Sequence, residues 1–273
     1  MVTKKKKSMG PLLVQSAFTA DEFVGRLSQL SKKLTTDNSR YFRGDDRNNK
    51  FLGVQMSAIF SLAKQFTQMP LPEVKQLLAS NYYEARMGAV SIMDFKARDG
   101  KITDDRRKEL YSIYMKHHDR INNWDLVDRS APYVVGGYLF DKSRAPLYKL
   151  AKSKNVWERR TAIVSTYYFI RRNDLAATFK IAALLIHDKH DLINKAVGSW
   201  VREAGKRDKQ QLINFLDEYA ATMPRVTLRY AIEKLDKKQK AHYLSVGKSV
   251  VLRYVPWVYD KLAIDYWVLN IRY

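Results

Sequence analysis

Apolar residues recur at intervals of three and four along most of this chain, which is the spacing of one face of an amphipathic helix. The first example is given by Phe23, Leu27 and Leu30, which follow an acidic turn. A second apolar stripe runs over 54–67. The polar stretch at 37–50 between the two stripes is interpreted as a loop. The pattern therefore predicts helices joined by polar connections.

Pro70 and Pro72 end the second stripe and predict a short helix over 73–79, since proline fits the first turn of a helix. Further segments with the same apolar spacing predict helices at 82–97, 104–120, 123–139, 144–153, 156–172, 174–187, 190–205, 208–222, 225–234 and 236–246. Pairs of these helices recur every ~30 to 45 residues, a period typical of helical-repeat proteins. Because one pair cannot bury its apolar face alone, we expect the pairs to stack into an α-solenoid.

No stretch rich in Gly, Ser or Pro divides the helical part, so residues 19–247 are expected to form one domain. Residues 1–18 carry four lysines at 4–7 and are interpreted as a flexible basic tail. Residues 248–273 are rich in Val, Ile, Tyr and Trp, and three interpretations stay open for them. They dock on the last repeat, form a helix that binds a partner or a membrane surface, or are a non-native or disordered extension.

The charge says more about partners than about the fold. Lys and Arg number 49 against 28 Asp and Glu, and the resulting net charge of +21 favours a polyanionic partner. The 11 Gly and 7 Pro are few for the turns of a β-sandwich or barrel, and the absence of cysteine excludes disulfides, thiolate zinc sites and a cysteine nucleophile. Neither a signal-peptide pattern nor a run of 18 apolar residues occurs. We therefore expect a soluble cytoplasmic protein, nucleoid-associated in a prokaryote, with no membrane partner.

A tryptophan and an aspartate four residues apart form the first candidate site. Asn123 is suited to the N-cap of a helix, so Trp124 and Asp128 would share one face of its first turns. An indole face and a carboxylate side by side contact a cation, the indole through its π system and the carboxylate through its charge. The alternative is a buried tryptophan beside an aspartate that interacts with the helix dipole. Spacing alone leaves both interpretations open.

Trp157 and Arg160 form a second candidate pair, at the start of the helix expected at 156–172. They are three residues apart and share a face, and an arginine there can bind a phosphate together with the amides of the helix N-terminus. In the alternative interpretation, Arg160 forms a salt bridge between repeats with Glu158 or Asp128.

Other motifs are less specific. Gly198, in the middle of a predicted helix, indicates either close helix packing or room for a ligand. The pair His187 and His190 lies at a helix junction without a third ligand in register, so we interpret it as a loop and expect no metal. Glycine motifs for phosphates or dinucleotides are absent. Basic clusters near helix ends, which form either a concave stripe or solvated caps, are Arg171-Arg172, Lys206-Arg207-Lys209 and Lys237-Lys238-Lys240.

Taken together, these segments resemble the AlkD family of DNA alkylation-repair proteins, which are DNA glycosylases built from HEAT-like repeats. The resemblance covers residues 20–246. It is carried by WDLVD at 124–128, WERR at 157–160, KAVG at 195–198 followed by Arg202-Glu203, Arg40-Tyr41 ahead of FLGV at 51–54, and YYEAR at 82–86.

The resemblance implies a fold and an activity. The fold would be a right-handed α-solenoid of HEAT-like repeats with DNA in a concave basic groove. The activity would be hydrolysis of the N-glycosidic bond of cationic N3- or N7-alkylated purines, without a metal or other cofactor. We expect base removal without strand cleavage, because no lysine nucleophile stands in register. The protein would be a monomer whose partner is double-stranded DNA with alkylated bases.

The resemblance also assigns roles by position. Asp128 resembles the catalytic carboxylate, and Trp124 a neighbouring aromatic residue of the lesion site. Arg160 resembles the arginine that binds the DNA backbone, and Tyr41 the tyrosine that borders the lesion. Further DNA contacts are expected from Arg159, Trp200, Lys206 and Arg207.

The sequence departs from the family at Ser199, because the family often has tryptophan directly after the glycine, whereas Trp200 comes one residue later. One residue turns the side-chain direction on a helix by about 100°. Either a local shift brings Trp200 into place or the aromatic pocket is incomplete. Two functions from different classes follow. The first is a monofunctional alkylpurine DNA glycosylase, and the alternative is a noncatalytic helical-repeat protein that binds DNA or acts as a scaffold.

Overall fold

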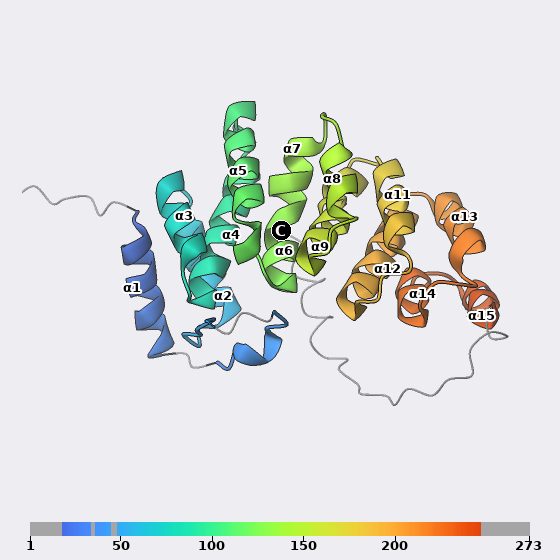
Figure 1. Cartoon of the computed structure of the whole chain (residues 1–273), viewed down its shortest axis with the longest axis horizontal. Helices are drawn as coiled ribbons and strands as arrows, with labels where there is room; N and C mark the ends of the chain where they lie inside the picture. Colours follow the sequence, from blue (N-terminus) through green and yellow to red (C-terminus); the bar gives the residue numbers. More distant parts are fainter. Residues whose placement is uncertain (1–17, 34–35, 45–47, 247–273) are drawn as a thin grey trace, which may run out of the picture.

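The computed structural model describes residues 18–33, 36–44 and 48–246. In this part of the chain every regular element is a helix, apart from a single parallel bridge between Lys50 and Tyr82. The helices pack in two rows along an arc that runs from α1 to α15 (Figure 1). The inner row, which lies on the inner side of the arc, consists of α2 (Met56–Gln65), α4 (Tyr83–Ala97), α6 (Trp124–Ala131), α9 (Val156–Ser165), α12 (Asp191–Gly205) and α14 (Arg225–Ala231).

Each helix of the inner row contacts the next, from α2 on α4 to α12 on α14. The outer row covers the other side and consists of α1 (Ala20–Ser31), α3 (Leu71–Ala79), α5 (Asp104–Lys116), α8 (Ala145–Leu150), α11 (Ala176–Leu185) and α13 (Lys209–Tyr219), and α15 (Lys237–Ser245) lies beside α14 at the end of the arc. Shorter helical turns join the rows: η1 (Ser39–Tyr41), η2 (His118–Arg120), η3 (Pro132–Gly136), α7 (Gly137–Leu139) and α10 (Tyr167–Ile170). The all-α stack expected from the sequence is confirmed.

One buried apolar core extends through the whole stack, from Ala20 and Phe23 at one end to Leu235 and Tyr243 at the other. Its members come from the faces that repeat every three and four residues, which is why the helix positions could be predicted. Six of the described helices, α1, α5, α9, α12, α13 and α15, begin at a residue whose side chain accepts a bond from the first turn. The Thr19 hydroxyl accepts from the Glu22 amide, for example.

The helix expected over 123–139 is interrupted. It begins as α6, widens into the π-helical turn η3 at Pro132, and ends as α7. Proline has no N–H, so it cannot donate to the carbonyl of Asp128 four residues earlier, and its ring crowds that carbonyl. The widened turn therefore directly follows the helix that carries Trp124 and Asp128.

Gly198 is explained by packing, which was one of the two alternatives. A Cβ atom at this position would lie 2.5 Å from the Thr227 carbonyl oxygen and 2.6 Å from the Tyr230 Cβ. Glycine thus allows α12 and α14 to approach more closely than any larger residue would.

The two predicted terminal segments, 1–18 and 248–273, lie outside the described residues except for Phe18. Among the helices that are described, none combines the length and apolar character required to span a bilayer.

Candidate active site

Asp128 and Arg160 form a bidentate ion pair between neighbouring helices of the inner row. Arg160 Nε donates to one carboxylate oxygen of Asp128 at 2.8 Å, and Nη2 to the other at 2.7 Å. A third bond runs from Nη1 to the Leu192 carbonyl at 2.6 Å, so one guanidinium joins α6, α9 and the start of α12. The Asp128 side chain is 13% exposed and that of Arg160 is 7% exposed, which places the pair at the edge of the surface.

This arrangement is the salt bridge between repeats that was one of the two interpretations of Arg160. Both side chains also retain capacity for further hydrogen bonds. An arginine has five N–H donors, and the bonds to Asp128 and Leu192 engage three of them. Each oxygen of the carboxylate accepts one bond from Arg160 and retains a further lone pair. The ion pair is therefore compatible with a phosphate on Arg160 and a positive charge near Asp128.

Trp124 lies on the same helix as Asp128 and is bonded to the N-terminal part of the chain. Its indole Nε1 donates to the Tyr41 carbonyl at 3.1 Å. The Tyr41 hydroxyl in turn accepts a bond from Arg40, whose guanidinium also lies 4.7 Å from the centre of the Tyr41 ring. The structure thus brings Tyr41 to Trp124 and Arg160 to Asp128, and α6 carries both Trp124 and Asp128.

Asn123 takes a different part from the one expected. It occupies the N-cap position of α6, but its side chain makes no capping bond there. Its Oδ1 instead accepts from the Arg43 amide at 2.9 Å, and its Nδ2 lies 2.7 Å from Asp125 Oδ1 and 3.2 Å from both the Tyr41 carbonyl and the Tyr83 hydroxyl. Asn123, Asp125 and Tyr83 therefore form a buried polar cluster that joins α4, the start of α6 and the segment that contains Tyr41.

Burial dominates the ionisation of this cluster. It raises the pKa of Asp125 to about 6, although hydrogen bonds from Tyr83, Asn123 and the Leu126 amide stabilise the charged form. The neighbouring charge of Asp128 raises the pKa of Asp125 further. Burial, followed by the Asp125 charge, also raises the pKa of Tyr83 well above its usual value.

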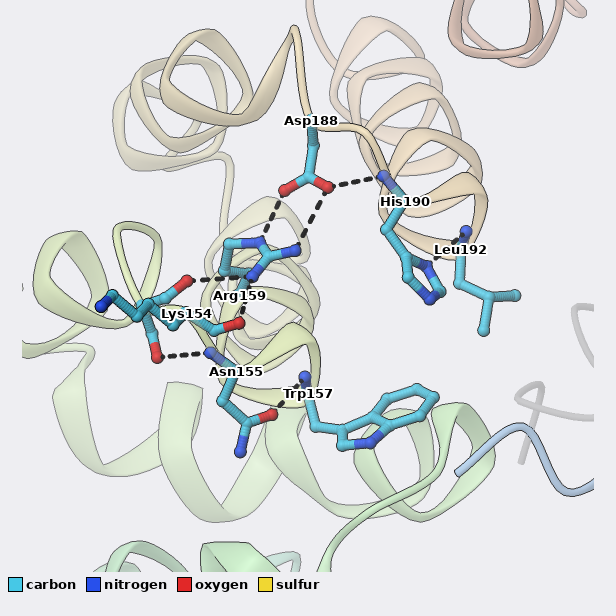
Figure 2. Close-up of polar contacts among 8 residues, drawn as sticks. Lys154, Asn155, Trp157, Arg159, Asp188, His190 and Leu192 are labelled. Atoms are coloured by element: carbon cyan, nitrogen blue, oxygen red, sulfur yellow. Dashed lines mark hydrogen bonds and ion pairs between the residues drawn. The ribbon is translucent and has the colours of Figure 1, made fainter. Parts of the chain in front are cut away.

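Arg159, next to Arg160, points to a different place. Figure 2 shows its guanidinium between Asp188, which it contacts at 2.6 and 3.3 Å, and the loop before α9. There it donates to the carbonyls of Ser153 and Lys154 at 2.9 and 3.0 Å. Arg86 makes the same bonds to the residues six and five positions before it, Ser80 and Asn81. Arg159 thus belongs to a repeated junction of the stack, and its contact with DNA stays a prediction.

The expected histidine loop has structural partners in the same region. Asp188 accepts from the His190 amide as well as from Arg159, and His190 Nδ1 accepts from the Leu192 amide (Figure 2). The Trp157 amide is capped by Asn155, and its ring lies 6.4 Å from that of His190. No group of three residues able to hold a metal occurs in the described ranges.

Trp200 packs between the C-terminal part of α9, α10 and α11. Its Nε1 donates to the Val164 carbonyl at 3.1 Å, and its ring lies 6.2 Å from that of Tyr167. It joins a small apolar cluster with Ile170, Leu175, Phe179 and Ala204. Lys206, the C-cap residue of α12, is paired with Glu203 of that helix, and Arg207 is exposed. Their expected DNA contacts also stay predictions.

The fifth residue of each later helix in the inner row is charged. These residues are Asp128 in α6, Arg160 in α9, Lys195 in α12 and Arg229 in α14, whereas α4 has the buried Met87. Asp128 and Arg160 contact each other across neighbouring helices, whereas Lys195 is paired with Asp191 of its own helix at 2.8 Å. One carboxylate is therefore followed along the row by three cations.

The class of protein defined here is a helical stack whose inner row carries an aspartate, an arginine and aromatic side chains. A family model described as DNA alkylation repair enzyme matches residues 27–235. The chain therefore belongs to the DNA alkylation repair enzyme family. This agrees with the resemblance inferred from the sequence.

Two solved structures share the fold at low sequence identity. A predicted DNA alkylation repair enzyme from Enterococcus faecalis superposes with a TM-score of 0.55 at 16% identity, covering 80% of this chain and 97% of that one. AlkD2 from Streptococcus mutans gives a TM-score of 0.50 at 17% identity, with 80% of this chain and 100% of that chain covered. A comparison with curated proteins finds no significant match.

Proposed function

We propose that the protein is a monofunctional DNA glycosylase that hydrolyses the N-glycosidic bond of cationic N3- or N7-alkylated purines in duplex DNA. The observation that carries this proposal is the Asp128 carboxylate, held by Arg160 at the edge of the surface and on the same helix as Trp124. Family membership supports a role in alkylation repair, and the charges along the inner row support a DNA partner.

The chemistry needs few groups. A purine alkylated at N3 or N7 is already positively charged, so it leaves without a strong general acid. The sugar then develops positive charge, which a fixed carboxylate stabilises electrostatically because it is oriented before the reaction. In this proposal Asp128 supplies that charge and positions the attacking water. Arg160 orients Asp128 and uses its further N–H donors for a phosphate, and the Trp124 face attracts the cationic base or sugar.

A second function, noncatalytic binding of DNA, is supported by one observation. Arg160 bonds to both oxygens of Asp128, as in a purely structural ion pair. A protein of this kind would bind duplex DNA with an affinity that falls steeply with salt, but it would release no base.

Release of 7-methylguanine from methylated duplex DNA separates the two functions. The glycosylase requires release by the unaltered protein and loss of release in Asp128→Asn, with DNA affinity retained. Asp188→Asn is the matched control, because Asp188 forms the corresponding bidentate pair with the adjacent arginine, Arg159. This control is expected to leave release unchanged. Equal release by Asp128→Asn and the unaltered protein would reject the role of Asp128, and binding without release by the unaltered protein would favour the second function.

A further inference from the structure

A segment 80 residues away in sequence is fastened to the helix that carries Asp128. The segment 39–44 contains η1 and Tyr41, and its main chain contacts two side chains at the start of α6. The Tyr41 carbonyl lies within hydrogen-bonding distance of Asn123 Nδ2 and Trp124 Nε1, at 3.2 and 3.1 Å. The Arg43 amide donates to Asn123 Oδ1 at 2.9 Å. The aromatic ring of Tyr41 is therefore placed by contacts of its own backbone.

The orientation of the Asn123 side-chain amide is determined by Asp125. An ionised carboxylate only accepts hydrogen bonds, so Asp125 Oδ1 selects the NH2 end of Asn123 at 2.7 Å. The carbonyl end of the Asn123 amide then faces the Arg43 amide. Asp125 is itself fixed by the Tyr83 hydroxyl, which donates to Oδ2, and by the Leu126 amide at 2.9 Å. All three side chains are buried, so no water competes for these bonds.

The chain on both sides of this segment is held by Glu84, the residue after Tyr83. Buried Glu84 accepts from the amides of Leu52 and Gly53, both at 2.9 Å. It also accepts from Asn38 Nδ2 at 2.8 Å, and Asn38 further donates to the Val54 carbonyl. Asn38, directly before the segment 39–44, and Leu52 and Gly53 further along are thus held on α4, while the Tyr41 part of the segment is held at the start of α6.

We propose that Asn123, Asp125 and Tyr83 are positioning residues for base release, which hold Tyr41 and Trp124 in fixed places relative to Asp128. The inference rests on the proposed glycosylase activity and extends it to three buried residues. Reaction rates depend steeply on the placement of groups near the reacting bond, and a displacement of about 1 Å can lower a rate about 100-fold. A rigid support behind the site therefore contributes to the reaction rate more than to DNA affinity.

The experiment compares Tyr83→Phe and Asn123→Ala with Tyr243→Phe. Tyr243 is also a buried tyrosine that donates to an aspartate, Asp217, at 2.7 Å, but it lies in α15, the last of the described helices. We expect the single-turnover release of 7-methylguanine at saturating enzyme to fall about tenfold or more in the two site variants. Affinity for the same DNA stays within about twofold, because the phosphate contacts remain. Tyr243→Phe, at a similar loss of thermal stability, releases base at the unaltered rate.

Trypsin cleavage after Arg40 and Arg43 gives a second readout that needs no activity. Both arginines are exposed, so cleavage reports how firmly the segment is held. We expect faster cleavage in Asn123→Ala and Tyr83→Phe, and no change in Tyr243→Phe. Faster cleavage with unchanged base release would overturn the inference, since the segment would then be dispensable for the reaction. Tyr83→Phe removes only one oxygen atom. If Asn123→Ala fails to fold, the release rate and the cleavage rate of Tyr83→Phe alone test the inference.

The outcomes distinguish the inference from the function on which it rests. If the unaltered protein releases no base, the proposed glycosylase activity and the inference fail together. If it releases base and both site variants do so at the same rate, the inference alone fails. A loss of DNA affinity that matches the loss of rate would also reject it, because the three residues would then act on binding rather than on positioning.

Discussion

Asp125 is expected to make the stability of the protein depend on pH in a way that Asp125→Asn removes. The pKa of this carboxyl lies at about 6 in the folded chain, against 3.8 for an ordinary aspartate, with burial as the main cause. The folded state therefore holds a proton on Asp125 between these values, whereas the unfolded state has released it. Under those conditions the free energy of unfolding falls as the pH rises.

The size of the effect follows from the two pKa values. They differ by about 2 units, and each unit corresponds to about 1.4 kcal/mol, so Asp125 lowers the stability by about 3 kcal/mol between pH 4 and pH 7. The contribution is constant below the unfolded value, where both states are protonated, and again above the folded value, where both are ionised. Asparagine does not titrate, so Asp125→Asn becomes more stable relative to the unaltered protein over this interval.

Urea unfolding at half-unit steps from pH 4 to pH 7 measures this difference. Most other titrating groups contribute equally to both proteins and cancel. Tyr243→Phe is the control, because the pKa of Tyr243 is raised to about 12 and this group does not titrate in the interval. Its difference from the unaltered protein is expected to be flat. A flat difference for Asp125→Asn, within about 0.5 kcal/mol, would refute the reasoning that burial outweighs the hydrogen bonds to this carboxylate.

Two further predictions concern packing and the ion pair. Arg160→Met is expected to destabilise the protein by about 3 to 5 kcal/mol, since it leaves the Asp128 carboxylate partly buried without its partner, and adding Asp128→Asn should restore more than half of the loss in urea unfolding. Additive losses in the double variant would contradict this coupling. Gly198→Ala should destabilise by about 1 to 2 kcal/mol because the new Cβ meets the backbone of α14, whereas Gly25→Ala, with no atom within 4 Å, should stabilise α1 by about 0.5 to 1 kcal/mol. Thermal unfolding measures both, and a stabilised Gly198→Ala would show that α12 and α14 separate without loss.

The sequence predicts helices well where the information is local. Most expected helix bounds agree with the structure within a few residues, because amphipathic spacing acts over one or two turns. The expected helix over 123–139 did not include the break after α6, because the apolar spacing continues across Pro132. The proline itself is a signal for such a break. The second break, between α9 and α10 at Thr166, has no such signal in the sequence.

The candidate site is predictable only in part. Spacing placed Trp124 and Asp128 on one helix, and it left the partner of Arg160 open between a phosphate and a carboxylate. The support by Asn123, Asp125 and Tyr83 was missed, because its bonds join residues about 40 and 80 positions apart and no local periodicity records them. A signal was present in the polar residues around Trp124. A buried aspartate in an otherwise apolar helix start needs partners, and such partners come from other elements.

Two adjacent arginines in α9 show which feature of the site is specific. Arg159 repeats the bonds of Arg86 to carbonyls six and five residues earlier, so this position serves the stacking of repeats. In the same comparison, the position equivalent to Arg160 is occupied in α4 by Met87, a buried apolar residue. Stacking alone is thus satisfied by a methionine at that position, and it does not require an arginine paired with an aspartate at the edge of the surface. The ion pair of Arg160 and Asp128 is therefore a departure from the repeat pattern that stacking does not require. Such departures are expected at functional sites.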